Sequence, residues 1–158
     1  MPIYMKYGEI KGQEKTKGFE EQVQCSSFQF GVGRGIGSAG GGGHREASSP
    51  SVSEIVVTKM QDKSSTGFLQ ESLFGEGQKV KFSFTKTGAV GDAPQTYLTI
   101  ELENALVSGY SLSSGGDQPS ESISINFTKI VWNLLETDSK NKASKPATAT
   151  WNLETGTP

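Results

Sequence analysis

The chain has 158 residues, a formal net charge of −2, 33% hydrophobic residues and 20 glycines. This length fits a single domain over residues 1–158 and allows a substantial core. The charge balance gives no broad basic surface, which disfavours nucleic-acid binding, and the apolar runs are too short to insert into a membrane.

Apolar and polar residues alternate along most of the chain, and this period is typical of strands with one buried face. One stretch instead places Phe68, Leu69 and Leu73 near helical spacing. This helix is expected to pack its apolar face on the sheet and to end in a left-handed conformation at Gly75 or Gly77. The helix is predicted over residues 64–74 and the strands over residues 3–10, 19–30, 52–60, 79–86, 96–107, 121–134 and 147–153.

Two of the predicted strands change phase. In the second strand, Val23 and Cys25 share one parity, whereas Phe28 and Phe30 share the other. The strand over residues 121–134 changes phase in the same manner. Each change implies a bulge or sharp bend, by which a strand turns from one sheet into another. The predicted fold class is therefore all-β with one helix: a closed or nearly closed β-barrel of two sheets, with the single α-helix packed on its side.

Cys25 is the only cysteine, which excludes an intramolecular disulfide and suits a reducing cytoplasm. No basic residue adjoins it, so we predict a small buried residue rather than a reactive thiol. Residues 1–6 do not begin a basic segment followed by an apolar stretch and a cleavage site. No cleaved signal peptide is expected.

An extended glycine-rich loop is predicted at residues 31–50. Long loops in compact domains are usually functional or disordered, and composition alone leaves both a flexible connector and a contact loop open. Residues 35–40 formally match the dinucleotide-binding fingerprint. The glycines that follow cannot easily open a helix, however, and no βαβ pattern surrounds them. We therefore expect no nucleotide cofactor.

Candidate catalytic and metal-binding residues are sparse. His44 is the only histidine and lies in the glycine-rich loop, where an exposed polar residue is favoured over a catalytic base or metal ligand. No Gly-x-Ser-x-Gly elbow positions a serine nucleophile. Glu101 and Glu103 share a strand face without apolar surroundings that would raise a carboxyl pKa, so an exposed or inter-subunit polar face explains them. The sequence predicts no catalytic residue, no metal site and no cofactor.

Several motifs gain specificity from their order along the chain. Residues 3–12 end in Ile-Lys-Gly, residues 28–31 read Phe-Gln-Phe-Gly, residues 58–65 read Thr-Lys-Met-Gln-Asp-Lys-Ser-Ser and residues 151–153 read Trp-Asn-Leu. Residues 96–132 contain a leucine strand, a Val-Ser-Gly-Tyr step, a Gly/Ser/Asp turn and a strand reading Glu-Ser-Ile-Ser-Ile-Asn-Phe-Thr-Lys-Ile. In this order the motifs resemble the Hcp family, the tube proteins of bacterial type VI secretion systems.

The resemblance implies a structural protein and not an enzyme. Hcp-like subunits would form homohexameric rings that stack into a tube inside a contractile sheath, with a VgrG-type spike at the tip. The tube would hold effector cargo in its lumen and be expelled from the bacterial cell. In the family, the residue between the two aromatics of the second strand faces the lumen, which assigns Gln29 to cargo contact. The long loop would contact neighbouring subunits or rings through Gly33, Arg34, Gly35, Ile36, Gly40, Gly41, Gly42, Gly43, His44 and Arg45.

Three other interpretations are open. A bacteriophage tail-tube subunit would share the barrel and the ring, but should lack the Trp-Asn-Leu ending combined with the Asn-Phe-Thr-Lys-Ile strand. A monomeric β-barrel that binds a small apolar ligand would be distinguished by its mass. An enzyme such as a hydrolase would need a constellation of catalytic residues that the sequence does not contain.

Overall fold

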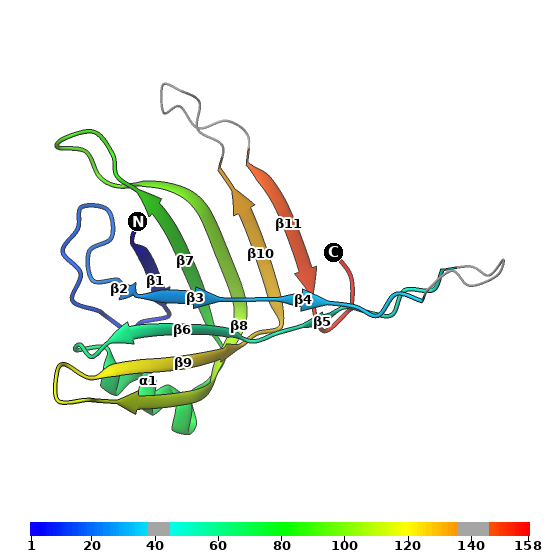
Figure 1. Ribbon diagram of the computed structural model, residues 1–158, viewed down its shortest axis with the longest axis horizontal. Coiled ribbons are helices and arrows are strands. Elements are labelled where there is room, and N and C mark those ends of the chain that lie inside the picture. The colour runs from blue at the N-terminus through cyan, green and yellow to red at the C-terminus, as the bar shows by residue number, and fades with distance from the viewer. Residues whose placement is uncertain (38–44, 136–145) are drawn as a thin grey trace.

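The computed structural model describes residues 1–37, 45–135 and 146–158. Strands dominate these residues, and one helix lies beside the sheet (Figure 1). The prediction of a mostly β protein with one helix is confirmed. The elements are β1 (Ile3–Tyr7), β2 (Val23–Cys25), β3 (Ser27–Gln29), β4 (Val32–Gly33), β5 (Ser51–Val52), β6 (Ile55–Met60), α1 (Ser65–Phe74), β7 (Gln78–Lys86), β8 (Gln95–Ser113), β9 (Ser120–Asn126), β10 (Lys129–Leu134) and β11 (Ala147–Asn152).

Nine strands pair into one bent sheet, and β4 with β5 forms a separate two-stranded ribbon. The paired path runs β2-β1-β7-β8-β9-β6-β3, and β10 joins it by pairing with β8 and carries β11 on its other side. We call β2, β1, β7, β10, β11 and the N-terminal half of β8 layer 1. Layer 2 consists of β9, β6, β3 and the C-terminal half of β8. Figure 1 shows the strands of the two layers crossing at a steep angle.

β8 is 19 residues long and belongs to both layers. Its N-terminal half pairs with β7 on one side and β10 on the other, whereas residues 106–113 pair with β9. The chain turns at Asn104, whose φ of 52° is left-handed, a conformation that Asn adopts more readily than most residues. A register shift between Val107 and Gly109 adds a bulge, which increases the twist. The strand predicted over residues 96–107 is therefore too short, because pairing resumes beyond the bend.

The two predicted phase changes coincide with breaks between strands. Ser26 separates β2 from β3, and its N–H donates to the Thr58 carbonyl at 2.7 Å. Phe127 and Thr128 separate β9 from β10, and the Thr128 N–H donates to the Glu103 carbonyl at 3.1 Å. Both predicted bends are confirmed. A closed barrel is not confirmed, because the path begins at β2 and ends at β3 and no ladder among the described strands joins these ends.

The core lies between the layers and is built from alternate strand residues. The half-buried ring of Phe28 on β3 meets the ring of Phe82 on β7 edge-on, with centroids 5.0 Å apart, and so links layer 2 to layer 1. Burial of each large apolar side chain contributes about 1.5–3 kcal/mol, and a slip of one residue would expose a whole set of them. The fully buried apolar side chains include Met5, Tyr7, Val23, Ile55, Val57, Phe68, Phe82, Ile100, Leu102, Ile123 and Ile125.

α1 packs against β8 through one large apolar residue, Phe68, whose ring meets Tyr7 edge-on at 5.4 Å. Leu69 and Leu73 are 43% and 71% exposed, so the predicted packing of these two leucines on the sheet is wrong. Successive helical residues point about 100° apart, and the position of Phe68 toward the sheet therefore turns Leu69 away from it.

The end of α1 also differs from its prediction. Gly75 has a φ of −67° and an extended conformation, not a left-handed one. A Cβ atom at this position would lie 2.5 Å from the Glu71 carbonyl oxygen, so close approach to the last turn makes glycine the fitting residue. Among the described residues, no helix has the length and apolar character needed to cross a membrane.

Candidate functional site

β3 presents Gln29 on the outer side of layer 2. Phe28 and Phe30 are half-buried and pack against the core, where the Phe30 ring lies 5.9 Å from the ring of Trp132. Gln29 is exposed, as strand alternation requires. The predicted outward orientation of Gln29 is confirmed, and its contact with cargo stays a prediction.

The outward face of layer 2 carries hydroxyl groups in rows across four strands. One row of ladder partners consists of Ser27, Thr58, Ser122 and Ser111. The hydroxyl oxygens of Ser27 and Thr58 lie 2.6 Å apart. None of the outward residues on these strands is charged, and we call this surface the hydroxyl face. It comprises Ser27, Gln29, Val56, Thr58, Met60, Leu106, Gly109, Ser111, Ser113, Ser120, Ser122, Ser124 and Asn126. At its edge the Glu54 carboxylate, just before β6, accepts hydrogen bonds from Ser108 Oγ at 2.8 Å and from Asn126 Nδ2 at 3.3 Å.

The outward face of layer 1 is charged. Lys81 Nζ lies 4.0 Å from Glu101 Oε1, and Lys129 Nζ lies 3.8 Å from Glu103 Oε1. Pairs as exposed as these contribute at most about 1 kcal/mol. Both glutamates therefore belong to an exposed polar face, as predicted. We call this surface the charged face, and its charged residues are Lys6, Lys79, Lys81, Glu101, Glu103 and Lys129.

The charged side chains on the strands of layer 2 point inward instead. Lys59 of β6 and Glu121 of β9 are ladder partners that form an ion pair, and both side chains are fully buried. Lys59 Nζ also lies 3.1 Å from Asp62 Oδ1 and donates to Ser65 Oγ at 3.3 Å and to the Met60 carbonyl at 3.0 Å. The ammonium group is thereby fully supplied with oxygen partners in place of water.

Two contacts extend this network to β8 and to α1. The Tyr110 hydroxyl donates to Glu121 Oε1, and burial together with this hydrogen bond raises the pKa of Tyr110 to about 12. Lys59 Nζ lies 5.9 Å from the centre of the Phe68 ring. The network ties three strands of layer 2 to the start of the helix. The inward position of Lys59 was not predicted, although Lys59 shares the inward parity of Val57.

A two-stranded arm, residues 30–37 with 45–54, leaves the body of the protein (Figure 1). Backbone hydrogen bonds join its strands along their length: the Ser53 N–H donates to the Gly31 carbonyl at 2.9 Å, and the Ser48 N–H to the Gly35 carbonyl at 2.9 Å. Isolated two-stranded ribbons are marginally stable in water, so a partner surface would stabilise this arm.

The predicted contact residues lie on the arm where the structure describes them. Gly35 donates its N–H to Ser48 Oγ at 2.8 Å, so the start of the dinucleotide-like motif belongs to a ribbon and not to a helix N-terminus. Contact by the arm stays a prediction. Gly33, Arg34, Gly35, Ile36 and Arg45 are all exposed. Gly40, Gly41, Gly42, Gly43 and His44 lie outside the described residues.

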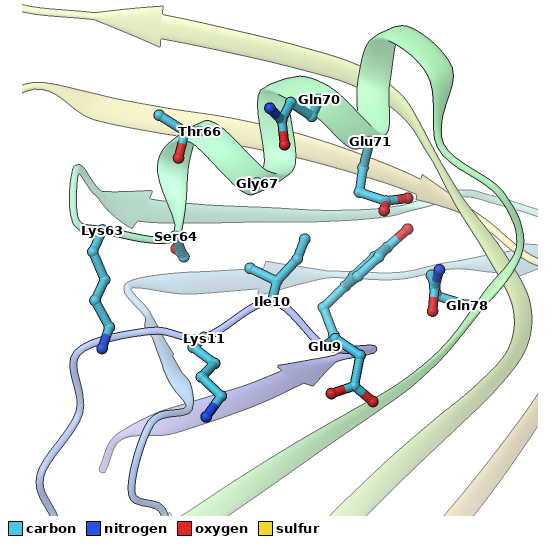
Figure 2. A pocket seen from close by; sticks show the side chains of 11 residues that line it. Glu9, Ile10, Lys11, Lys63, Ser64, Thr66, Gly67, Gln70, Glu71 and Gln78 are labelled. Atoms are coloured by element: carbon cyan, nitrogen blue, oxygen red, sulfur yellow. The ribbon is translucent and has the colours of Figure 1, made fainter.

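A cleft of about 320 Å³ lies between α1 and the loop after β1. Figure 2 shows Lys11 and Lys63 on one side of this cleft and Glu71 and Gln78 on the other. Burial and the nearby Glu71 carboxylate raise the pKa of Tyr7, which keeps its phenol protonated. Among the described residues, neither histidine nor cysteine lines the cleft, so these residues do not form the nucleophile and base pair of Ser-His or Cys-His hydrolases.

Cys25 is a free thiol in the core, and burial raises its pKa to about 12. The thiol is therefore protonated at neutral pH, and the prediction of a small buried residue is confirmed. Across residues 1–37, 45–135 and 146–158, no group of three or more His, Cys, Asp or Glu could hold a metal ion.

Comparison with solved structures finds the same fold over nearly the whole chain. A type six secretion system protein is 21% identical, with 98% of this chain and 97% of that chain covered and a TM-score of 0.88. Hcp1 from Salmonella typhimurium is 16% identical, with 98% and 95% covered and a TM-score of 0.76. A type VI secretion system effector from Yersinia pestis is 20% identical, with 95% and 98% covered and a TM-score of 0.75.

Identities this low establish the fold alone. No curated protein matches the sequence. The family model for the type VI secretion system effector Hcp matches residues 4–134, which is most of the chain. The protein therefore belongs to the Hcp family of type VI secretion system proteins.

Proposed function

We propose that the protein is a structural tube subunit, a single Hcp-like domain over residues 1–158 that assembles into homohexameric rings. The rings stack into the inner tube of a type VI secretion system and are expelled with effectors in the lumen. One observation carries this proposal: the outward faces of the two layers differ in charge, as the inner and outer walls of a cargo tube would.

The hydroxyl face is the proposed wall of the lumen, with Gln29 as a cargo contact. Its serine and threonine side chains are short and uncharged, so they offer hydrogen bonds without attracting one sign of charge. A cargo of either charge would then pass without strong electrostatic capture. The exposure of Gln29 between two core-facing aromatics supports this orientation.

The arm is the proposed contact with the neighbouring ring. Support comes from its length beyond the body and from the exposed apolar side chains of Val32 and Ile36, at 59% and 53%. An exposed ribbon of this kind gains order when a partner covers it. Gly33, Arg34, Gly35 and Arg45 would take part in the same contact as exposed neighbours.

The charged face is the proposed outer wall, directed toward the contractile sheath. A VgrG-type spike would bind at the end of the stack, and the protein would leave the bacterial cell with the tube.

The proposed subunit is a nearly closed barrel. The hydrogen bond from Ser26, the residue between the two ends of the strand path, to Thr58 supports this closure.

We assign no catalytic activity, because the subunit would act through self-complementary surfaces. A second candidate is a monomeric barrel that binds a small apolar ligand. It is favoured by one feature, an apolar cleft of about 390 Å³ beside β10 and β11. A bacteriophage tail-tube subunit would share the ring but not the family match over residues 4–134.

Light scattering and negative-stain microscopy of the purified chain at micromolar concentration test the proposal together. We expect the mass of a hexamer and rings with sixfold symmetry. A stable monomer would contradict the tube subunit and favour the ligand-binding barrel.

A further inference from the structure

Two exposed apolar surfaces lie on opposite sides of the protein. The helix stripe consists of Leu69, Leu73 and Phe74 on α1, which are 43%, 71% and 74% exposed. The edge cleft, about 390 Å³ in volume, is lined by the polar Thr150 and by the apolar residues Phe30, Val32, Ile130, Trp132, Ala149 and Trp151. Figure 1 shows α1 and the β10–β11 edge well separated, one at the lower left and one at the right.

The helix stripe is convex and uncharged. Gln70 and Ser72 lie beside the two leucines, and the Ser72 hydroxyl already donates to the Leu69 carbonyl at 2.7 Å. Single exposed leucines are ordinary, but three large apolar side chains within six residues of a ten-residue helix form a patch. Leu69 and Leu73 are one helical turn apart, the spacing by which helices anchor in apolar grooves.

The edge cleft is concave and also uncharged. Its floor comes from the inward side chains of β10 and β11, where Trp132 and Ala149 are ladder partners, as are Ile130 and Trp151. Layer 2 does not cover this part of the floor, because β3 ends at Gln29 and the chain continues into the arm. Two tryptophans in an open apolar floor are typical of the anchor positions of an interface.

We propose that the helix stripe of one copy docks in the edge cleft of the next copy around the ring. A ring closes by a head-to-tail interface, which requires two different complementary patches on each subunit. One convex and one concave uncharged patch on separate sides of the same chain meet that requirement. None of the residues that make up the two patches is charged, so their contact would carry no large cost of burying ions. This inference rests on the proposed function, since it assumes that the chain forms rings.

Disulfide trapping tests the contact directly. Leu73→Cys combined with Ala149→Cys should give, on oxidation, a ladder of covalent multimers up to the whole ring. Each single variant should give no ladder, and a mixture of the two single variants should give covalent dimers only. The native Cys25 does not interfere, because it is buried.

Leu73→Cys with Thr148→Cys is the matched control, since Thr148 points to the opposite side of β11 and should not cross-link. A second pair, Leu69→Cys with Ala149→Cys, protects the test against poor geometry at Leu73. Light scattering before oxidation shows whether rings form, and so tests the tube subunit separately from the docking of the helix stripe. Rings without cross-links in either pair, or equal cross-linking through Thr148, would overturn the docking and leave the tube subunit standing, whereas monomers would overturn both.

Discussion

Both layers supply alternate apolar residues to one core, but they place their charges on opposite sides. In layer 1, Lys81 and Glu101 lie on the outward face with about half of each side chain exposed. In layer 2, Lys59 on β6 and Glu121 on β9 are likewise partners on neighbouring strands. Their side chains point inward, however, and both are fully buried. The strands of layer 2 therefore carry no charged side chain on their outward face, and Glu54, just before β6, lies at its edge. Position relative to the core, more than the number of charged residues, decides what a sheet presents to its surroundings.

The largest predicted effect is on the free energy of unfolding, and it distinguishes the inward charged residues of layer 2 from the outward charged residues of layer 1. Lys59→Met leaves Glu121 and Asp62 buried without their cation and should lower the free energy of unfolding by about 3–5 kcal/mol. Lys81→Met on the charged face is the control and should cost at most about 1 kcal/mol. Urea unfolding of both variants measures the difference. Equal costs would show that the inward pair has no special structural role.

The stability of the protein at alkaline pH should depend on two groups that lie inside the layers, the Cys25 thiol and the Tyr110 hydroxyl. The pKa of Cys25 is raised from 9.0 to about 12 by burial, and that of Tyr110 from 10.0 to about 12 by burial and its bond to Glu121. Both groups hold their protons more tightly when folded, so their stabilisation is complete below pH 9 and is lost between pH 9 and 12. Urea unfolding across this range should show a steady fall in stability. Cys25→Ala should make the slope shallower, and an unchanged slope would contradict the assignment.

The arm belongs to neither face, and its apolar residues should matter for assembly only. Ile36→Ser should change the free energy of unfolding by no more than about 0.5 kcal/mol, because the side chain is 53% exposed. Ring stacking, measured by sedimentation, should weaken because the arm loses an apolar contact. Val90→Ser, at an exposed apolar residue outside the arm, is the control and should leave stacking intact. Equal stacking in both variants would return the arm to a passive connector.

The smallest effect on stability is expected on the hydroxyl face. Gln29→Ala should stay within about 0.5 kcal/mol of the parent, since the side chain is exposed, yet change the recovery of effector proteins with purified rings. Lys79→Ala, on the charged face, should leave cargo recovery unchanged. Destabilisation by several kcal/mol would mean that Gln29 is a core residue.

Alternation in the sequence predicts most strands because one buried face imposes a period of two. It also locates the bends at Ser26 and after Phe127, where the apolar parity shifts. The bend in β8 also shifts the parity, from Ile100 and Leu102 before it to Ala105 and Val107 after it, but the apolar Leu106 between the last two hides this shift in the sequence. A second local sign is Asn104, a residue that adopts the left-handed conformation without glycine.

The functional surfaces were less predictable for a related reason. Lys59 has the parity of an inward residue, but a charged residue inside a core is expected only when its partner is known, and Glu121 lies 62 positions away in sequence. The exposed Leu69 and Leu73 were assigned to the core because helical spacing shows that residues share a face but not where that face points. The burial of Lys59 depends on a partner distant in sequence, and the exposure of the two leucines on a proposed partner in another copy.

Electron cryomicroscopy of the assembled rings tests the central claim most directly, because it resolves which strands line the lumen. We predict a hexameric ring in which β3, β6, β9 and the C-terminal half of β8 form the inner wall, with Gln29 facing the lumen and the charged face outside. A ring with Lys81 and Glu101 on the inner wall, or a protein that remains monomeric, would contradict the account.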